Sequence, residues 1–162
     1  MTATLASAAA TRTADENSHN LDSPRARALL QAAREMGPVL IARQEECALD
    51  HRIPEATIAD FHDAGFFRIL QARKYGGYEM DPQVFYSLLL ELARYCMSSA
   101  WVLGVIGVHN WQMNLFDDAA AEEVWGEDPT VLVSSSYAPV GRVVPQDVGF
   151  RLSGRWSFSS GC

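Results

Sequence analysis

The sequence predicts an α+β fold. An N-terminal α-helical domain over residues 23–129 is followed by the beginning of an antiparallel β-domain, left incomplete, over residues 130–162. Up to about residue 125, apolar residues recur every three to four positions behind Ser-Pro and Asp-Pro pairs, which is typical of capped helices. After residue 130, β-prone segments at 142–144 and 150–152 flank a glycine-containing loop, which predicts a hairpin.

Residues 1–22 are predicted to form a disordered tail. They are rich in Ala, Thr and Ser, and they lack the basic start and sustained apolar core of a secretory signal. The most apolar later stretch, residues 100–108, is far shorter than the roughly 20 residues that a bilayer requires. We therefore expect neither export nor insertion into a membrane.

Charge and cysteine content narrow the class of protein further. The formal net charge is −7 and Lys74 is the single lysine, which argues against nucleic acid or an anionic membrane as a partner. The cysteines, Cys47, Cys96 and Cys162, are odd in number and show no CxxC spacing. This favours a reducing, cytoplasmic location, with neither a zinc site nor a disulfide framework.

The first helix is expected to begin at Ser23 and Pro24, with serine as the N-cap and proline in the first turn. Gly37 and Pro38 interrupt its apolar pattern, so a kink or a restart is expected before the helix ends at about Cys47.

The next two helices carry similar signals. One is expected to begin at Pro54 and to stop at Gly65. Asp81 and Pro82 open the following helix, which carries a broad apolar stripe over residues 84–95. The breadth of this stripe predicts burial against other helices on more than one side.

A fourth helix is predicted to begin at Ser98 and Ser99, which could serve as its N-cap. Gly104 and Gly107 each lower its intrinsic stability by about 1 kcal/mol relative to alanine. We therefore expect another element to pack closely against the backbone there. On spacing alone, His109 in this helix is interpreted as a core histidine with a satisfied hydrogen bond.

Residues 155–161 predict a strand with two different faces. One face carries Trp156, Phe158 and Ser160, and the other carries Arg155, Ser157 and Ser159. An aromatic wall with hydroxyl groups beside it suits a flat, polar ring system. The same alternation is also typical of an ordinary half-buried sheet, and on the residues alone both interpretations stay open.

Several motifs together resemble the oxygenase component of two-component flavin-dependent monooxygenases that hydroxylate phenols. They include the letters SAWV from residue 99, GVHNW from residue 107, SSSYAP from residue 134 and FRLSGRWSFSSG from residue 150. The resemblance covers nearly all of the chain after about residue 24. It is nearest to the member that acts on a steroid-derived phenol in bacterial sterol degradation, and it implies an acyl-CoA dehydrogenase-like fold.

The resemblance implies a reaction and its first site residues. A separate reductase would supply reduced FMN or FAD, and oxygen would then be used to hydroxylate the phenol ortho to its hydroxyl group. His109 would face the substrate and hydrogen-bond the phenolic oxygen. Of the serines at 134–136, Ser135 is chosen as the one beside the flavin or the phenol.

The resemblance also implies a flavin-contacting set and no metal ligand. The residues expected to line the flavin ring are Trp156, Phe158, Ser159 and Ser160. Trp101 and Arg155 are candidates for the flavin edge, because a guanidinium group can pair with phosphate. The alternative interpretations are a core position for Trp101 and a solvated strand position for Arg155.

Two other functions are weighed. An acyl-CoA dehydrogenase-type flavoprotein would share the layout, but Trp156 stands where that family's hairpin has lysine, and SSSYAPVGR replaces its first flavin loop. A non-catalytic helical module would bind a partner through residues 84–95, Trp111 and Trp125. Relatives of the oxygenase continue into a helical bundle, so we expect an N-terminal fragment that is inactive alone and a homo-oligomer when full length.

Overall fold

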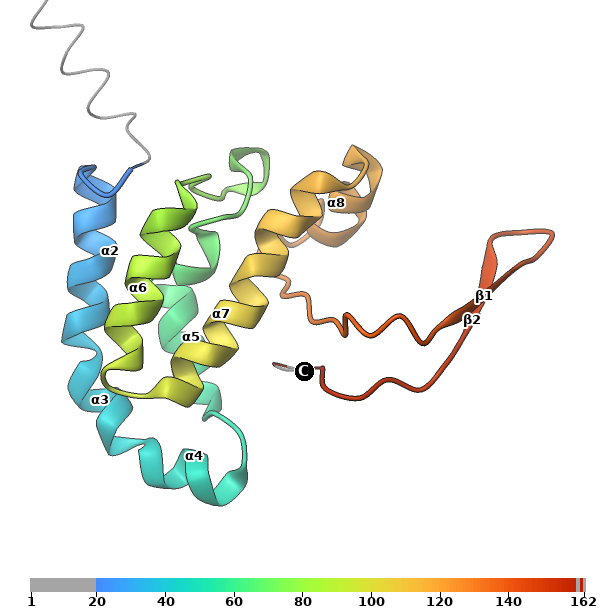
Figure 1. Cartoon of the computed structure of the whole chain (residues 1–162). Helices are drawn as coiled ribbons and strands as arrows, with labels where there is room; N and C mark the ends of the chain where they lie inside the picture. The colour runs from blue at the N-terminus through green and yellow to red at the C-terminus, as the bar shows by residue number, and fades with distance from the viewer. Residues whose placement is uncertain (1–19, 160, 162) are drawn as a thin grey trace, which may run out of the picture.

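A computed structural model describes residues 20–159 and 161 (Figure 1). Its helices pack side by side, and a two-stranded antiparallel hairpin projects away from them, so the predicted α+β class is confirmed. The helices are α2 (Pro24–Glu35), α3 (Gly37–Ala42), α4 (Gln44–Asp50), α5 (Glu55–Asp63), α6 (Pro82–Ala93), α7 (Met97–Gln112) and α8 (Asp118–Trp125). Shorter 3₁₀ turns are η1 (Phe66–Arg68), η2 (Arg73–Tyr75) and η3 (Met113–Leu115), and the strands are β1 (Arg142–Pro145) and β2 (Phe150–Ser153).

Side-chain caps place the starts of three of the seven described helices, namely α2, α6 and α8. The Ser23 hydroxyl accepts a hydrogen bond from the Ala26 amide at 3.1 Å, and the Asp81 carboxylate accepts one from the Gln83 amide at 2.8 Å. The predicted restart at Gly37 is confirmed, because α2 ends just before it and α3 begins there. The predicted end near Cys47 is wrong, since α4 continues to Asp50.

The predicted N-cap of the fourth helix is also wrong. Helix α7 begins at Met97, behind an extended Cys96, so Ser98 and Ser99 lie inside its first turn. Ser99 is buried and its hydroxyl donates to the Cys96 sulfur at 3.2 Å. Because Cys96 already breaks the helical conformation, the serines are not needed as caps.

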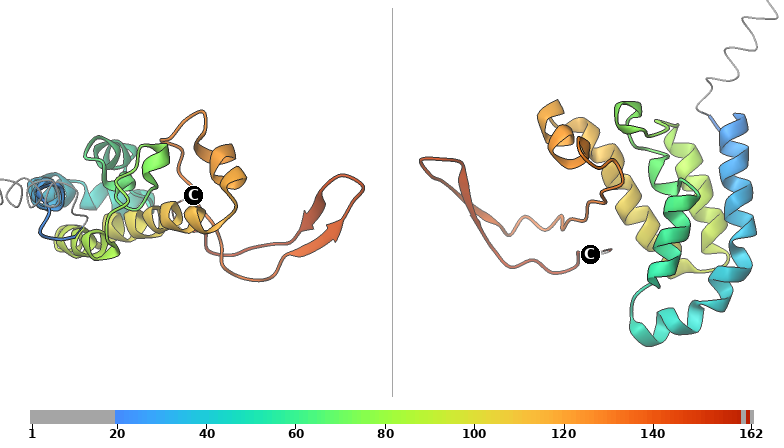
Figure 2. Two further views of the ribbon diagram at one scale, coloured as in Figure 1. Left: turned by 90° about the horizontal axis from the view of Figure 1, so that it is seen from above. Right: turned by 180° about the vertical axis from the view of Figure 1, so that it is seen from behind.

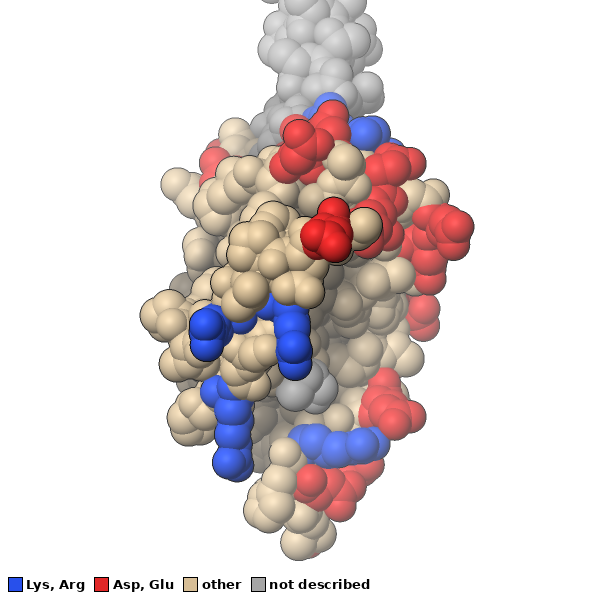
Figure 3. Space-filling model, turned by 90° about the vertical axis from the view of Figure 1, so that its right-hand side faces the viewer, with Lys and Arg blue, Asp and Glu red and all other residues tan. Residues whose placement is uncertain are grey.

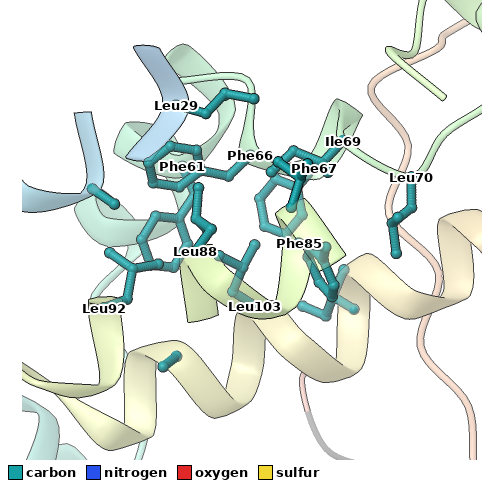
Figure 4. Packing of buried hydrophobic residues seen from close by; sticks show 14 of the residues in the cluster. Leu29, Phe61, Phe66, Phe67, Ile69, Leu70, Phe85, Leu88, Leu92 and Leu103 are labelled. Atoms are coloured by element: carbon teal, nitrogen blue, oxygen red, sulfur yellow. The ribbon is translucent and has the colours of Figure 1, made fainter. Parts of the chain in front are cut away.

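The core lies where α6 packs between α2 and α7, with α5 and η1 closing it (Figure 4). The α6 residues Val84, Phe85, Leu88 and Leu92 are fully buried, which confirms the prediction that its stripe is covered on more than one side. The proposed partner surface at 84–95 is therefore largely core. Of the two tryptophans of that hypothesis, Trp125 is also buried, at 1% exposure, whereas Trp111 is 45% exposed.

Helices α6 and α7 approach closely at two glycines, as predicted. A Cβ atom at Gly107 would lie 2.5 Å from Cζ of Phe85, and one at Gly104 would lie 3.2 Å from Cδ1 of Leu89. The first distance is too short for any real contact, whereas a leucine methyl group can move by the few tenths of an ångström that the second requires.

These two glycines give a matched pair of variants. We expect Gly107→Ala to lower the free energy of unfolding by about 1–2 kcal/mol, because overpacking against Phe85 outweighs a gain in helix propensity of about 1 kcal/mol. Gly104→Ala should leave the free energy unchanged or raise it by up to about 1 kcal/mol. Urea unfolding followed by circular dichroism measures both, and equal effects of the two variants would contradict the packing argument.

The hairpin forms as predicted, and its strands pair from Arg142 with Ser153 to Pro145 with Phe150. Gly149 in the connecting loop has φ of 77°, the left-handed conformation that glycine adopts without strain. Every residue of both strands is exposed, and the hairpin extends as an arm from the helices (Figure 2).

The strand predicted at 155–161 is wrong. Residues 154–159 make no β-ladder, and Phe158 has a left-handed φ of 54°. Trp156 and Phe158 therefore do not share a strand face. Side-chain bonds hold this segment instead: the Ser136 hydroxyl donates to the Ser157 carbonyl and the Trp156 indole to the Ala138 carbonyl, each at 3.1 Å.

Candidate functional site

The candidate site lies where an extended segment runs along α7. This connecting segment, residues 131–141, is anchored at its start by the Trp125 indole, which donates to the Val131 carbonyl at 3.0 Å. Further along, Nε2 of His109 lies 2.5 Å from Oγ of Ser135. The structure thus brings together the two residues predicted to be catalytic, although they are 26 positions apart in the chain.

The hydrogen bonds of His109 determine its tautomer. Nδ1 is hydrogen-bonded to the Val105 carbonyl, one turn earlier in α7. Since a carbonyl only accepts, Nδ1 carries the proton and Nε2 of the neutral ring is the acceptor. The Ser135 hydroxyl therefore donates to Nε2. The buried ring, 2% exposed, presents a basic nitrogen with the serine oxygen next to it.

Tyr137 joins the site and was not predicted. Its ring centroid lies 5.8 Å from that of His109, and its hydroxyl donates to Oε1 of Gln112 at 2.9 Å. Two local spacings could have identified it. In an extended segment Tyr137 shares a side with Ser135, and Gln112 shares a helix face with His109.

Asn110 is a second residue that the sequence did not single out. It is 2% exposed, and its Nδ2 donates to the Phe67 carbonyl at 2.6 Å. Its Oδ1 has no hydrogen-bond partner in the described part of the chain. Asn110 lines a cavity of about 180 Å³ with His62, and burial of His62 lowers the pKa of that imidazole, with the nearby Arg68 acting in the same direction.

The chain after the hairpin, here called the terminal segment (residues 154–159 and 161), returns to α7 near His109. A Cβ atom at Gly161 would lie 2.7 Å from Cγ1 of Ile106, which is one turn from His109. Trp156 packs over Gly141 of the connecting segment and is 38% exposed. Ser160, one of the residues expected to line the flavin, lies outside the described residues.

The remaining predicted flavin contacts are placed as follows. Phe158 is 93% exposed, Ser159 is half-buried and Arg155 is exposed. Trp101 is 63% exposed, so the alternative of a core position for it is wrong. It lies between two cavities of about 500 Å³ each, one toward α4 and one between α6 and α7.

Charge is uneven around this region. Figure 3 looks onto the hairpin side of the molecule, where blue basic side chains lie across the centre and lower part, a red acidic one lies just above them, and other red ones follow the upper and right-hand edges. Exposed arginines of the hairpin and its flank are Arg142, Arg151 and Arg155, although the chain as a whole carries a net charge of −7. An anionic group would meet cations here.

The exposed residues are of the types that hold a flavin. Trp101 and Phe158 expose large aromatic surfaces, as does Trp156 in part. Stacking on such surfaces is a common way to hold a flat ring. Within residues 20–159 and 161, no group of three His, Cys, Asp or Glu side chains could hold a metal ion. Among the same residues, no helix is long and apolar enough to cross a bilayer.

Comparison with known families and proteins gives consistent results. The family described as "Acyl-CoA dehydrogenase, N-terminal domain" matches residues 13–124. The oxygenase subunit HsaA of a flavin-dependent monooxygenase from Mycobacterium tuberculosis is 42% identical over 85% of this chain, which spans 35% of that protein. The oxygenase component of an FADH2-dependent resorcinol hydroxylase from a Rhizobium species is 39% identical over 75% of the chain and 29% of its own length.

Solved structures agree with these matches. The crystal structure of HsaA from Mycobacterium tuberculosis superimposes with a TM-score of 0.82 at 42% identity, covering 85% of this chain and 37% of that one. XiaF from a Streptomyces species, solved with FADH2 and glycerol, gives a TM-score of 0.78 at 30% identity, over 83% of this chain and 34% of its own. The chain therefore spans about a third of the length of these relatives.

Proposed function

Since the chain belongs to the acyl-CoA dehydrogenase N-terminal domain family, we propose that it is the N-terminal part of a two-component oxygenase that hydroxylates a phenol ortho to its hydroxyl group with reduced flavin and oxygen. The observation that carries this proposal is the hydrogen bond between His109 and Ser135, in which Nε2 of the imidazole lies toward the connecting segment and would be the basic nitrogen of the neutral ring. A phenol is a substrate that such a base would activate.

His109 and Ser135 would act on the phenolic proton. The substrate hydroxyl would donate to Oγ of Ser135, or directly to Nε2 of His109 in its place. Drawing the proton toward the imidazole increases the electron density on the phenolic oxygen and on the ring carbon ortho to it. Removal of such a positioned base typically costs about 10²–10⁴-fold in rate.

The terminal segment and α7 would hold the flavin. Trp101, Trp156 and Phe158 offer aromatic surfaces, Ser159 and Ser160 offer hydroxyl groups, and Arg155 offers a cation for phosphate. Reduced flavin, when bound, would supply the activated oxygen that is transferred to the ring. Apolar side chains packed around that oxygen would exclude water, which would otherwise consume the activated oxygen without hydroxylating the phenol.

Partners and substrates follow from this proposal. The oxygenase would receive FMN or FAD in reduced form from a separate flavin reductase, act in the cytoplasm and form a homo-oligomer when full length. Phenols, including a steroid-derived phenol, are the proposed substrates. The relatives that are described as flavin-dependent monooxygenase and hydroxylase components favour this function over acyl-CoA oxidation.

A hybrid enzyme tests the proposed function. This chain would replace the matching N-terminal part of the Mycobacterium tuberculosis HsaA. With a flavin reductase, NADH and a panel of phenols, we expect the hybrid to form a catechol, and the chain alone to form none. The same hybrid without reductase is the control. A folded hybrid that binds reduced flavin but hydroxylates no phenol, or that oxidises an acyl-CoA instead, would refute the proposal.

A further inference from the structure

A second contact between the connecting segment and α7 lies beside the bond from Ser135 to His109. The Tyr137 hydroxyl donates to Oε1 of Gln112 at 2.9 Å. Both contacts therefore join the same two elements, at neighbouring points along each of them. The proposed hydroxylation uses the contact between His109 and Ser135 and gives no part to the other.

The spacing along the chain places the two contacts next to each other. His109 and Gln112 are three positions apart and share a face of α7. Ser135 and Tyr137 are two positions apart and share a side of the extended segment. Three helical residues advance about 4.5 Å and two extended residues about 6.6 Å, and the long side chains of Gln112 and Tyr137 can take up the difference of about 2 Å.

Packing on the imidazole also holds the Tyr137 ring. Its centroid lies 5.8 Å from that of His109, with 33° between the two ring planes. The tyrosine is 67% exposed, so water competes for its hydroxyl group, and the packed ring keeps that group beside Gln112. An exposed ring packed on a buried one also covers the imidazole from solvent.

The connecting segment is otherwise held from its other side near Ser135. Within the described chain, residues 131–141 make no β-ladder. Hydrogen bonds at Ser136 and Ala138 tie this stretch to the terminal segment rather than to α7. The bond from Tyr137 is therefore the contact that can fix the distance between Ser135 and the helix.

We propose that Tyr137 and Gln112 are a positioning pair that holds the Ser135 hydroxyl against Nε2 of His109. The serine side chain is short, so a backbone shift of about 1 Å would take its hydroxyl group out of hydrogen-bonding range. The effect on catalysis rests on the proposed function. The positioning itself does not, and it can be measured on the chain alone.

Nuclear magnetic resonance of the chain tests the positioning. The ¹⁵N resonance of the imidazole Nε2 moves when that nitrogen gains or loses a hydrogen bond, and its absence from the His109→Asn variant identifies it. Ser135→Ala gives the resonance of a nitrogen without the serine. We expect Tyr137→Phe, which keeps the aromatic ring, to move the resonance toward that value. An unchanged resonance in folded Tyr137→Phe would overturn the proposal.

The hybrid enzyme that contains this chain tests the effect on catalysis. We expect Tyr137→Phe to lower kcat for hydroxylation by about 3–10-fold, which is the range that one hydrogen bond of this kind contributes. The KM for the phenol should change little, because the hydroxyl of Ser135 is displaced and not removed. Tyr86→Phe makes the same chemical change at an exposed position of α6 and should leave kcat unchanged.

Variants of Gln112 separate the hydrogen bond from a general effect on packing. Gln112→Glu keeps an oxygen that can accept from Tyr137 and should retain most of the activity, whereas Gln112→Leu should match Tyr137→Phe. Because residues that share one hydrogen bond give non-additive effects, the combined variant should be little slower than either single one. Additive losses would contradict the pairing.

Two outcomes distinguish a wrong positioning pair from a wrong proposed function. If His109→Asn lowers the catechol formed per oxygen consumed while Tyr137→Phe changes neither this ratio nor kcat, the function stands and the positioning pair is wrong. If His109→Asn also leaves hydroxylation unchanged, the proposed base is wrong, and the Nε2 resonance of the chain alone still decides whether Tyr137 positions Ser135.

Discussion

Replacing His109 by asparagine is expected to lower phenol hydroxylation by about 10²–10⁴-fold in an active enzyme that contains this segment. Asparagine is too short to place a group where Nε2 now meets the Ser135 hydroxyl, and its amide is not a base. Uptake of oxygen should continue, because reduced flavin reacts with oxygen without this side chain. The ratio of catechol formed to oxygen consumed is therefore the informative measurement.

His51→Asn is the matched control, since it makes the same chemical change elsewhere. His51 is exposed at the end of α4 with φ of 53°, a conformation that asparagine tolerates well. The hydroxylation rate of the His51→Asn variant should stay within about twofold of the wild type, since substitutions at such surface positions have small effects. If His109→Asn is folded and keeps a normal product ratio, the imidazole is not the base.

A double-variant cycle tests whether His109 and Ser135 act as one unit. Ser135→Ala removes the hydroxyl group that donates to Nε2. Residues that share one hydrogen bond give non-additive effects, so the double variant should be little slower than His109→Asn alone. Fully additive losses would indicate that the two residues contact the substrate independently.

The helical half of the fold was predictable because its signals are local. The caps at Ser23 and Asp81 act over two or three residues. The close approach at Gly107 follows from the cost of a glycine inside a helix. The error at Ser98 has the same physical basis: several polar residues near a helix start can cap it, and the conformation of Cys96 decides which one does.

The site was predictable only in part because its geometry depends on distant contacts. A family resemblance supplied His109 and Ser135, but only the fold shows that Val105 fixes the tautomer. The strand expected at 155–161 needed a partner strand that the described residues do not provide.

The stability of the helical domain should depend strongly on Phe61. Phe61→Ala is expected to lower the free energy of unfolding by about 3–5 kcal/mol, because the ring is fully buried and its removal leaves a cavity in the core. The ring also packs at centroid distances of 5.7 Å from Phe66 and 6.2 Å from Phe67. Because these aromatic contacts are lost as well, we expect the loss of unfolding free energy to lie in the upper part of that range.

The same substitution tests how the core supports the site. The Phe67 carbonyl accepts from Asn110, the neighbour of His109, so a shift of Phe67 into the cavity would move α7 at the site. Urea unfolding measures the stability loss, and the matched control is Phe150→Ala, at an exposed hairpin position, with an expected change within about 0.5 kcal/mol. A similar loss in both variants would show that burial of Phe61 is not the cause. A large loss of unfolding free energy for Phe61→Ala alone would indicate that the α5–η1 core supports the position of His109.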